Sequence, residues 1–370
     1  MKVSPFKLER YFDKYEFSAP YLLSSSDCEP LLLNELLEMA DENSRSEWDV
    51  LKLGYTESKG DPAFRNEISK LYTSITSDEV LVLVPQEGIF IAMNVLLEEG
   101  DHIVTTFPGY QSLYQVAEDI GCNVCKWEPD QNLKFQIQDL KDLVTDKTKL
   151  IVINFPHNPT GALISKNELD DIITIAREKG ITIFSDEMYR FMEYDDKDRL
   201  PSVCDLYENA ISLFGLSKTF GLPGLRMGWL TTRNKKFMQE FVNFKDYTTI
   251  CNNAPGEKLG TIALQNKEKL IQRSLGIIQK NLPLLEDFAN RHNKWFVWKS
   301  PKAGSIAFPE LKINGTVMDF CQDLVKKKGL MLLPHDVYDF SRKHVRIGFG
   351  RKSLPEALTV FEKYLKEENI

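Results

Sequence analysis

A lysine and an arginine lie eight residues apart in a glycine-rich segment. The segment reads Ser217-Lys218-Thr219-Phe220-Gly221-Leu222-Pro223-Gly224-Leu225-Arg226-Met227-Gly228-Trp229. It follows the apolar run Ile211–Phe214, which predicts a buried strand. Open α/β sheets bind ligands at the carboxyl ends of their strands, and glycines let the backbone approach a ligand closely. Lys218 therefore has the position of a reactive amine, and Arg226 could hold a phosphate by two parallel hydrogen bonds.

Two further polar segments follow apolar runs. Asn158 opens Asn158-Pro159-Thr160-Gly161, after the run that ends at Phe155. This sequence alone is a common turn and indicates little. Asp186 directly follows the apolar run Ile181–Ser185. A surface acidic residue is the simpler interpretation of Asp186, but its place at the end of a predicted strand favours a ligand contact.

These segments, in this order, resemble the motifs of the class I/II aminotransferases, which are enzymes of the aspartate-aminotransferase type that depend on pyridoxal 5'-phosphate (PLP). The resemblance implies that Lys218 forms a Schiff base with the cofactor aldehyde and carries a proton in catalysis. It also implies that Arg226 binds the cofactor phosphate and that Ser217 contacts the cofactor. Asp186 would pair with the pyridine nitrogen and keep it protonated, so that the ring accepts electrons from the substrate carbon.

The same resemblance assigns the remaining contacts to the cofactor. Asn158 and Tyr189 would bond the ring hydroxyl, and Tyr110 would stack on the ring. Backbone amides of Gln86 and Glu87, at the start of a predicted helix, would contact the phosphate. The family's usual glycine and serine in the phosphate loops are replaced by Val84 and Gly215.

Two assignments concern the substrate and a second subunit. Arg346 would hold the substrate α-carboxylate, with Asn158 beside it. An arginine between apolar strand residues is costly to bury without a charged partner, and a carboxylate substrate supplies one. Tyr55 would reach the phosphate of a neighbouring subunit, so the resemblance implies a homodimer. Whether His157 contacts the ligand is left open by the sequence.

Apolar runs alternate with amphipathic helical segments in the middle of the chain. The runs are Val80–Val84, Ile103–Thr106, Leu150–Ile153, Ile181–Phe184 and Ile211–Phe214. This alternation predicts an α/β fold with a mostly parallel central sheet and helices on both faces, the large domain of PLP fold type I. We expect this domain to span residues 46–280. A smaller α+β domain would combine residues 1–45 and 281–370.

Composition limits the partners of the protein. The formal net charge of −8 argues against a nucleic-acid partner. No apolar stretch of about 18 residues predicts a membrane span, and the N-terminus has no secretory signal. The six cysteines are expected to be reduced thiols in the cytoplasm, and a lone Cys122-x-x-Cys125 pair predicts no metal site.

The reaction itself has more than one interpretation. Transfer of an amino group from an L-amino acid to an α-keto acid is the leading hypothesis. The alternative is elimination, replacement or cyclisation, because Ser26-Asp27-Cys28-Glu29 resembles the branch that contains capreomycidine synthase, and its acidic groups could hold a cationic side chain. A PLP-sensing regulator is disfavoured, since the chain has no residues to spare for a DNA-binding domain.

Overall fold

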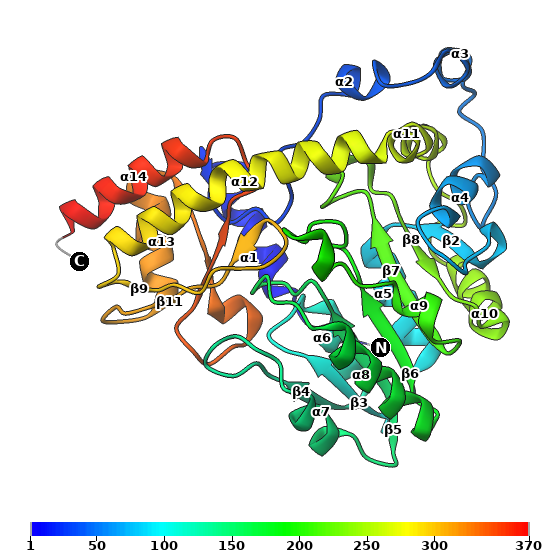
Figure 1. The fold of residues 1–370 in the computed structure, drawn as a ribbon, viewed down its shortest axis with the longest axis horizontal. Coiled ribbons are helices and arrows are strands. Elements are labelled where there is room, and N and C mark those ends of the chain that lie inside the picture. Colours follow the sequence, from blue (N-terminus) through cyan, green and yellow to red (C-terminus); the bar gives the residue numbers. More distant parts are fainter. Residues whose placement is uncertain (1, 369–370) are drawn as a thin grey trace.

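A seven-stranded sheet forms the centre of the larger part of the molecule (Figure 1). The computed structural model describes residues 2–368. The strands, in spatial order, are β2 (Val80–Leu83), β8 (Gly228–Thr231), β7 (Ala210–Gly215), β6 (Thr182–Asp186), β5 (Thr148–Asn154), β3 (His102–Thr106) and β4 (Asn123–Trp127). Strands β3 to β7 pair in parallel, whereas β8 runs antiparallel to both of its neighbours. The predicted mostly parallel sheet is therefore confirmed.

Both faces of this sheet are covered, because its strands are apolar at successive positions. On β5, Leu150 and Val152 pack into one core and Ile151 and Ile153 into the opposite core. Helices α5 (Pro85–Leu96), α6 (Ser112–Ile120) and α10 (Lys235–Lys245) cover the first face. Helices α7 (Ile137–Leu143), α8 (Lys166–Lys179) and α9 (Val203–Leu206) cover the second.

Side-chain caps fix the boundaries of several helices. Helix α4 (Pro62–Ser69) begins where the Asp61 carboxylate accepts hydrogen bonds from two backbone amides. Helix α8 begins with a capping box of Ser165 and Glu168. It ends at Gly180, whose positive φ of 65° is the left-handed conformation that glycine adopts most easily.

The smaller part of the molecule joins both ends of the described chain. Its elements are α1 (Lys7–Tyr15), β1 (Tyr21–Leu22), β9 (Phe296–Val297), β10 (Ile306–Ala307), β11 (Glu310–Leu311), α13 (Val317–Lys328), β12 (Leu330–Met331), β13 (Leu333–Pro334), β14 (Val345–Gly348) and α14 (Leu354–Glu367). Strand β1 pairs with β12, and one apolar core contains residues from α1, α13 and α14. The long helix α12 (Lys267–Arg291) runs between the two parts (Figure 1). The exact domain boundaries stay a prediction.

An extended arm connects the N-terminal segment with the sheet. It carries α2 (Leu33–Leu37) and α3 (Glu42–Asp49), which lie at the edge of the molecule beside α11 (Ala254–Gln265) (Figure 1). Residues 51–57 between α3 and α4 have no regular structure. None of the described helices is both long and apolar enough to cross a membrane.

Candidate active site

A cavity of about 340 Å³ opens at the carboxyl ends of β5, β6 and β7. Nine of the eleven predicted site residues line it: Gln86, Tyr110, Asn158, Asp186, Tyr189, Ser217, Lys218, Arg226 and Arg346. Tyr55 and the Glu87 side chain do not. The cavity lies where an open α/β sheet places its ligands.

The register between β5 and β6 brings Asn158 and Asp186 together. Asn154, the last residue of β5, pairs with Asp186, the last residue of β6. The Asn154 side-chain NH2 group donates to the Asp186 backbone carbonyl at 2.9 Å. The Asn154 side-chain oxygen accepts from the Asn158 backbone amide at 2.8 Å. Asn154 therefore links two strand ends and fixes the position of Asn158 against Asp186.

Asp186 is a buried acid whose ionisation is unfavourable. Its carboxyl group is 5% exposed and accepts a hydrogen bond from the Met188 amide at 3.0 Å. Burial raises the pKa of Asp186 to about 7, although this hydrogen bond and the nearby Lys218 ammonium act in the opposite direction. A carboxyl group in this state is suited to pairing with a cationic group of a ligand.

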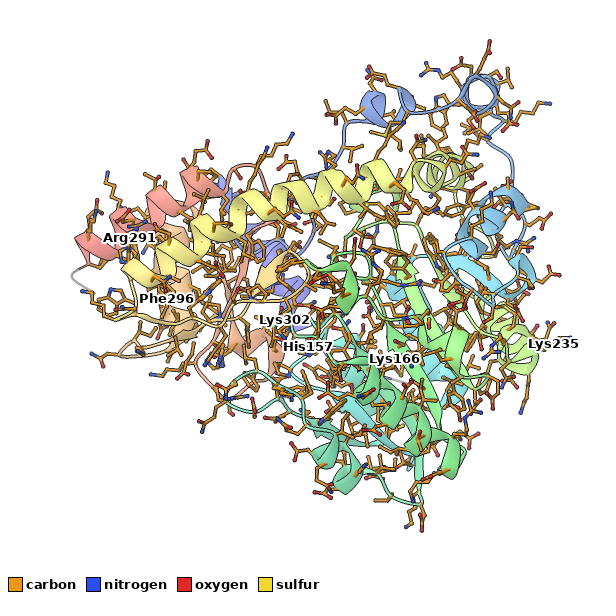
Figure 2. The ribbon with its side chains drawn as sticks, in the orientation of Figure 1. His157, Lys166, Lys235, Arg291, Phe296 and Lys302 are labelled. Atoms are coloured by element: carbon orange, nitrogen blue, oxygen red, sulfur yellow. The ribbon has the colours of Figure 1, made fainter. Side chains whose placement is uncertain are left out.

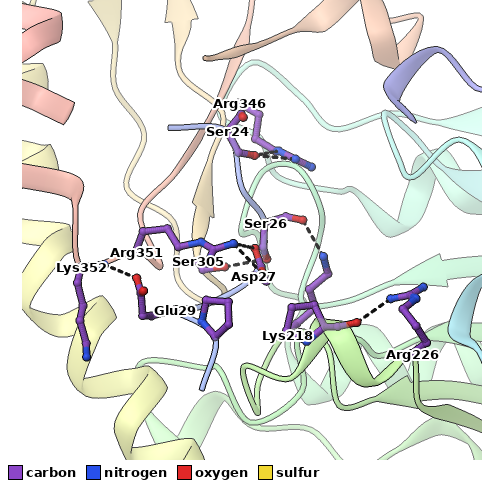
Figure 3. Close-up of polar contacts among 12 residues, drawn as sticks. Ser24, Ser26, Asp27, Glu29, Lys218, Arg226, Ser305, Arg346, Arg351 and Lys352 are labelled. Atoms are coloured by element: carbon purple, nitrogen blue, oxygen red, sulfur yellow. Dashed lines mark hydrogen bonds and ion pairs between the residues drawn. The ribbon is translucent and has the colours of Figure 1, made fainter. Parts of the chain in front are cut away.

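Lys218 points from the end of β7 toward the N-terminal segment (Figure 3). Its amine donates to the Ser26 hydroxyl at 2.8 Å. Burial lowers the pKa of the Lys218 ammonium, which increases the fraction present as a neutral amine. A neutral amine can act as a nucleophile and as a base. The next residue is anchored as well, since the Thr219 hydroxyl donates to the Arg190 carbonyl at 2.7 Å.

Donors for an anion lie at another side of the cavity. Arg226 donates to the Pro223 carbonyl at 3.0 Å and otherwise remains exposed at the rim. Helix α5 begins beside it, and first-turn amides of a helix lack acceptors within the helix. The Glu87 carboxylate instead caps the Val84 amide and accepts from Thr248 and Thr249. Only the Glu87 backbone amide therefore remains a candidate phosphate contact.

Arg346 extends from β14 into the same cavity and is 1% exposed. It donates to the Ser24 carbonyl at 2.7 Å (Figure 3), and also to the Tyr338 hydroxyl at 2.7 Å and the Asn158 side-chain oxygen at 3.3 Å. These acceptors are neutral, so the buried positive charge is not compensated by them. An anionic ligand such as a carboxylate would compensate it.

The two predicted tyrosines hold the N-terminal segment in place. The Tyr189 hydroxyl donates to the Ser26 carbonyl at 2.9 Å, which also accepts from the Ser305 hydroxyl at 2.9 Å. The Tyr110 hydroxyl donates to the Glu9 carboxylate at 3.1 Å. The resemblance assigned both tyrosines to the cofactor alone, and the structure adds these contacts within the chain.

Helix α1 contributes cavity residues that the sequence did not indicate. Leu8, Glu9, Phe12 and Glu16 all line the cavity. Their spacing of three and four residues places them on one helical face, which by itself predicts a buried face and no ligand contact. No local sequence pattern connects this helix with strand ends that follow more than a hundred residues later.

The acidic segment Ser26–Glu29 makes polar contacts within the chain. Arg351 donates to both Asp27 carboxylate oxygens at 3.0 Å, and the Lys352 amide donates to Glu29 at 3.0 Å (Figure 3). Groups of the chain itself therefore already engage both acids, and their binding of a cationic substrate stays a prediction, although Asp27 also lines the cavity.

Two other predicted positions lie outside the cavity. Tyr55 is 95% exposed on the segment between α3 and α4. His157 lies in the interior of the molecule (Figure 2). Its ring packs edge-on against Phe135 with 4.7 Å between the ring centroids, and its Nδ1 is hydrogen-bonded to the Thr160 hydroxyl. Burial lowers the pKa of His157 to about 3, so the ring is neutral. His157 is thus a core residue, which answers the open question from the sequence.

Metal coordination finds no support in the described residues. They contain no group of three or more histidine, cysteine, aspartate or glutamate side chains that could hold an ion. The Cys125 sulfur lies 3.1 Å from the Nε2 atom of His102. His102 is the first residue of β3, and the cavity lies at the opposite ends of the parallel strands.

Comparison with known proteins agrees with this geometry. A capreomycidine synthase of Streptomyces vinaceus is 26% identical over 283 residues, which cover 75% of this chain and 72% of that protein. An aspartate aminotransferase of Sulfolobus acidocaldarius is 28% identical over 319 residues, or 80% and 78% of the two chains.

Solved structures show the same architecture. A PLP-dependent aminotransferase from Streptococcus suis has a TM-score of 0.92 at 28% identity and covers 99% of both chains. The PLP-dependent cyclase OrfR has a TM-score of 0.91 at 25% identity and covers 100% of this chain and 98% of its own. The family model for aminotransferases of class I and II matches residues 23–359. Because this match spans most of the sequence, the predicted resemblance is confirmed, and the chain belongs to the class I and II aminotransferases.

Proposed function

We propose that the protein is a PLP-dependent aminotransferase that moves the amino group of an L-amino acid to an α-keto acid, with Lys218 as the residue that carries the cofactor. The family match confirms the predicted enzyme class, and the PLP dependence of the similar aminotransferase and cyclase confirms the predicted cofactor. One observation carries the assignment of residues: Lys218, Asp186 and Arg346 meet in a single cavity.

The cavity has the size and polar groups that PLP requires. A volume of about 340 Å³ lies within the range of small-molecule sites. Lys218 offers an amine for the aldehyde, and Asp186 offers a buried acid for the ring nitrogen. Arg226 and the first turn of α5 offer donors for a phosphate. Tyr110 and Asn158 also line the cavity, where they supply a flat ring and a side-chain amide for contact with the cofactor ring.

PLP, when bound, supplies a ring that accepts the negative charge left when an amino acid loses its α-proton. The protein contributes position and proton transfer. Arg346 would hold the α-carboxylate, which fixes the α-carbon relative to Lys218. The Lys218 amine would take the α-proton and return it, and its lowered pKa suits both steps. Asp186 would maintain the proton on the ring nitrogen.

Chemical labelling tests the position of the cofactor. The purified protein should be yellow, and borohydride reduction followed by peptide mapping should find the cofactor on Lys218. Reduction of the Asp186→Asn protein should label the same lysine. A label on another lysine would refute the proposed role of Lys218.

We also propose a homodimer in which Tyr55 completes the site of the partner. An exposed apolar surface supports this assembly: Leu53 and Tyr55 are exposed, as are Tyr247 and Ile250. The two segments are adjacent, since the Thr56 hydroxyl donates to the Asn252 carbonyl at 3.3 Å. Exposed apolar side chains gathered on adjacent segments are typical of protein interfaces.

Subunit mixing tests the shared site. Tyr55→Ala and Lys218→Ala proteins should each be inactive as pure dimers. Refolding them together should restore part of the activity, because a hybrid dimer contains one site with both native residues. A fully active monomer at assay concentration would contradict the assembly.

Elimination, replacement or cyclisation remains a second candidate reaction, favoured by the likeness to OrfR and to capreomycidine synthase. Incubation with donors in the absence of keto acid separates the two. Stoichiometric conversion to the amine form of the cofactor, ending after one turnover, supports transamination. Continuous turnover that releases ammonia or a cyclic product would instead support the second candidate.

The cytoplasm is the proposed location of the enzyme. All six cysteines are free thiols in the structure, as expected in a reducing compartment. Fluorescence microscopy of a C-terminal fusion in the native host would test this location.

A further inference from the structure

Helix α1 brings two carboxylates to the active-site cavity that the proposed cofactor does not require. We infer that the amino donor carries a cationic side chain, an ammonium or guanidinium group, which binds beside Glu9 and Glu16. This inference rests on the proposed function and defines the substrate class of the same site.

Both carboxylates project from the face of α1 that forms the cavity wall. Glu9, Phe12 and Glu16 are separated by three and four residues and all line the cavity. Glu16 follows the last residue of α1, where the exposed carbonyl groups give the helix end a partial negative charge. The helix end and the Glu16 carboxylate thus favour a cation at the same place.

No cation of the described residues is in direct contact with Glu16. Across residues 2–368, no ion pair or side-chain hydrogen bond engages its half-buried carboxylate. Burial raises the pKa of Glu16, the negative charges of Asp27 and Glu9 raise it further, and the more weakly acting cations Arg351 and Lys218 lower it. Glu9 and Glu16 therefore lie close enough to repel one another, and a cation bound between them would relieve this repulsion.

The other charged groups of the cavity have assigned partners. Asp27 is paired with Arg351 at 3.0 Å. Asp186 lines the cavity and is assigned to the ring nitrogen of the proposed cofactor. Arg226 and Arg346 are assigned to the phosphate and the α-carboxylate. Among the described residues Glu9 accepts a hydrogen bond only from the neutral Tyr110 hydroxyl and has no ion pair, although its charge acts on the Lys218 ammonium at longer range.

A buried hydroxyl provides an independent indication of a polar ligand. The Ser25 side chain lines the same cavity and is 4% exposed, and its hydroxyl has no hydrogen-bond partner in the described structure. A buried polar group without a partner is costly, and the N–H groups of a cationic side chain would satisfy it. An acidic side chain would instead add a further negative charge near Glu9 and Glu16.

Donor specificity of the wild-type holoenzyme is the first test. L-Arginine, L-ornithine, L-norleucine and L-aspartate are compared by the rate at which each converts the bound cofactor to its amine form. We expect kcat/KM for arginine or ornithine to exceed that for norleucine about tenfold and that for aspartate about 100-fold. The two basic donors distinguish a guanidinium from an ammonium preference. Equal rates, or a preference for aspartate, would overturn the inference.

Binding without turnover is the second test. In Lys218→Ala protein loaded with PLP, calorimetric titration should show that Glu16→Gln weakens arginine binding about tenfold. The matched control is Asp13→Asn, a carboxylate of the same helix that faces solvent and pairs with Arg10. Equal losses in both variants, or no loss in Glu16→Gln, would contradict a role for Glu16.

The two proposals fail in different ways. Absence of PLP from Lys218 would refute the proposed function itself. A yellow protein that carries PLP on Lys218 but prefers neutral or acidic donors would refute only the cationic substrate.

Discussion

The two sides of the active-site cavity are built by different physical means. The strand-end wall consists of Asn158, Asp186, Lys218 and Arg226, which follow or adjoin the ends of strands in one sheet. The N-terminal wall consists of α1, Glu16 and residues 25–27. Backbone pairing of the sheet sets the first wall, whereas side chains from distant segments set the second. We expect the first wall to control the chemical step and the second to control donor choice.

Hydrogen bonds illustrate the difference. In the strand-end wall, the Asn154 side chain joins the ends of the paired strands β5 and β6, because it bonds the backbone groups of Asp186 and Asn158. The N-terminal wall is held by Arg346, Tyr189 and Ser305, which donate to backbone carbonyls at least 163 residues away in sequence. An arrangement of this kind allows specificity to change without disturbing the sheet.

Lys218→Ala should have the largest effect on the strand-end wall. Loss of the amine that moves the α-proton should reduce the rate of transamination by about 1,000-fold or more, for basic and neutral donors alike. PLP should still bind through the remaining contacts. Exchange of the donor α-proton with deuterated water measures this step directly. The exposed Lys166→Ala protein is the control, and a comparable loss there would contradict a specific role for Lys218.

Asp186→Asn should have the next largest effect. An amide cannot maintain the ring proton as a carboxylate does, so we expect kcat to fall about 100-fold. The reduction should again be similar for every donor, which distinguishes this wall from Glu16. Stopped-flow measurement of the half-reaction with several donors tests both statements. A near-normal rate would mean that another group supports the ring nitrogen.

Much of the strand-end wall was predictable because its signals are local. Apolar runs of four or five residues located five of the seven strands of the sheet. A polar residue directly after such a run lies at the sheet edge, where ligands bind. This rule led to Lys218 and Asp186 before any packing was known. Strand β8 was missed because its four residues follow the glycine-rich segment without a separate apolar pattern.

The N-terminal wall could not be predicted for the opposite reason. Asp27 and Arg351 are 324 positions apart, and neither has a neighbour in sequence that indicates the pair. The acidic segment was recognised as unusual, but the sequence could not show that the chain itself neutralises Asp27. Likewise, α1 has an ordinary amphipathic pattern, and only tertiary packing places Glu16 in the cavity.

The stability of the cofactor-free protein should depend on pH through Asp186. Its pKa is about 7 in the folded chain and near 4 in an unfolded one. Its contribution to stability is therefore fully present below about pH 4 and is lost as the pH rises through about 7. At pH 8, cofactor-free Asp186→Asn should be more stable than wild type by about 2–4 kcal/mol, and the difference should vanish near pH 4. Urea unfolding at several pH values measures it, and a constant difference would contradict the raised pKa.

Arg351→Met should have the smallest effect and should act on the N-terminal wall alone. The Arg351 and Asp27 side chains are 22% and 12% exposed, so the pair is partly shielded from solvent. Removing the cation leaves Asp27 without its partner, and we expect a loss of about 1–2 kcal/mol in the free energy of unfolding. Hydrogen exchange should become faster in α1 and residues 21–28 but not in β5 to β7, because the sheet does not depend on this pair. The exposed Arg10→Met, which removes the Arg10–Asp13 pair, should cost less than about 0.5 kcal/mol. Faster exchange throughout the sheet in Arg351→Met would show that the two walls are not independent.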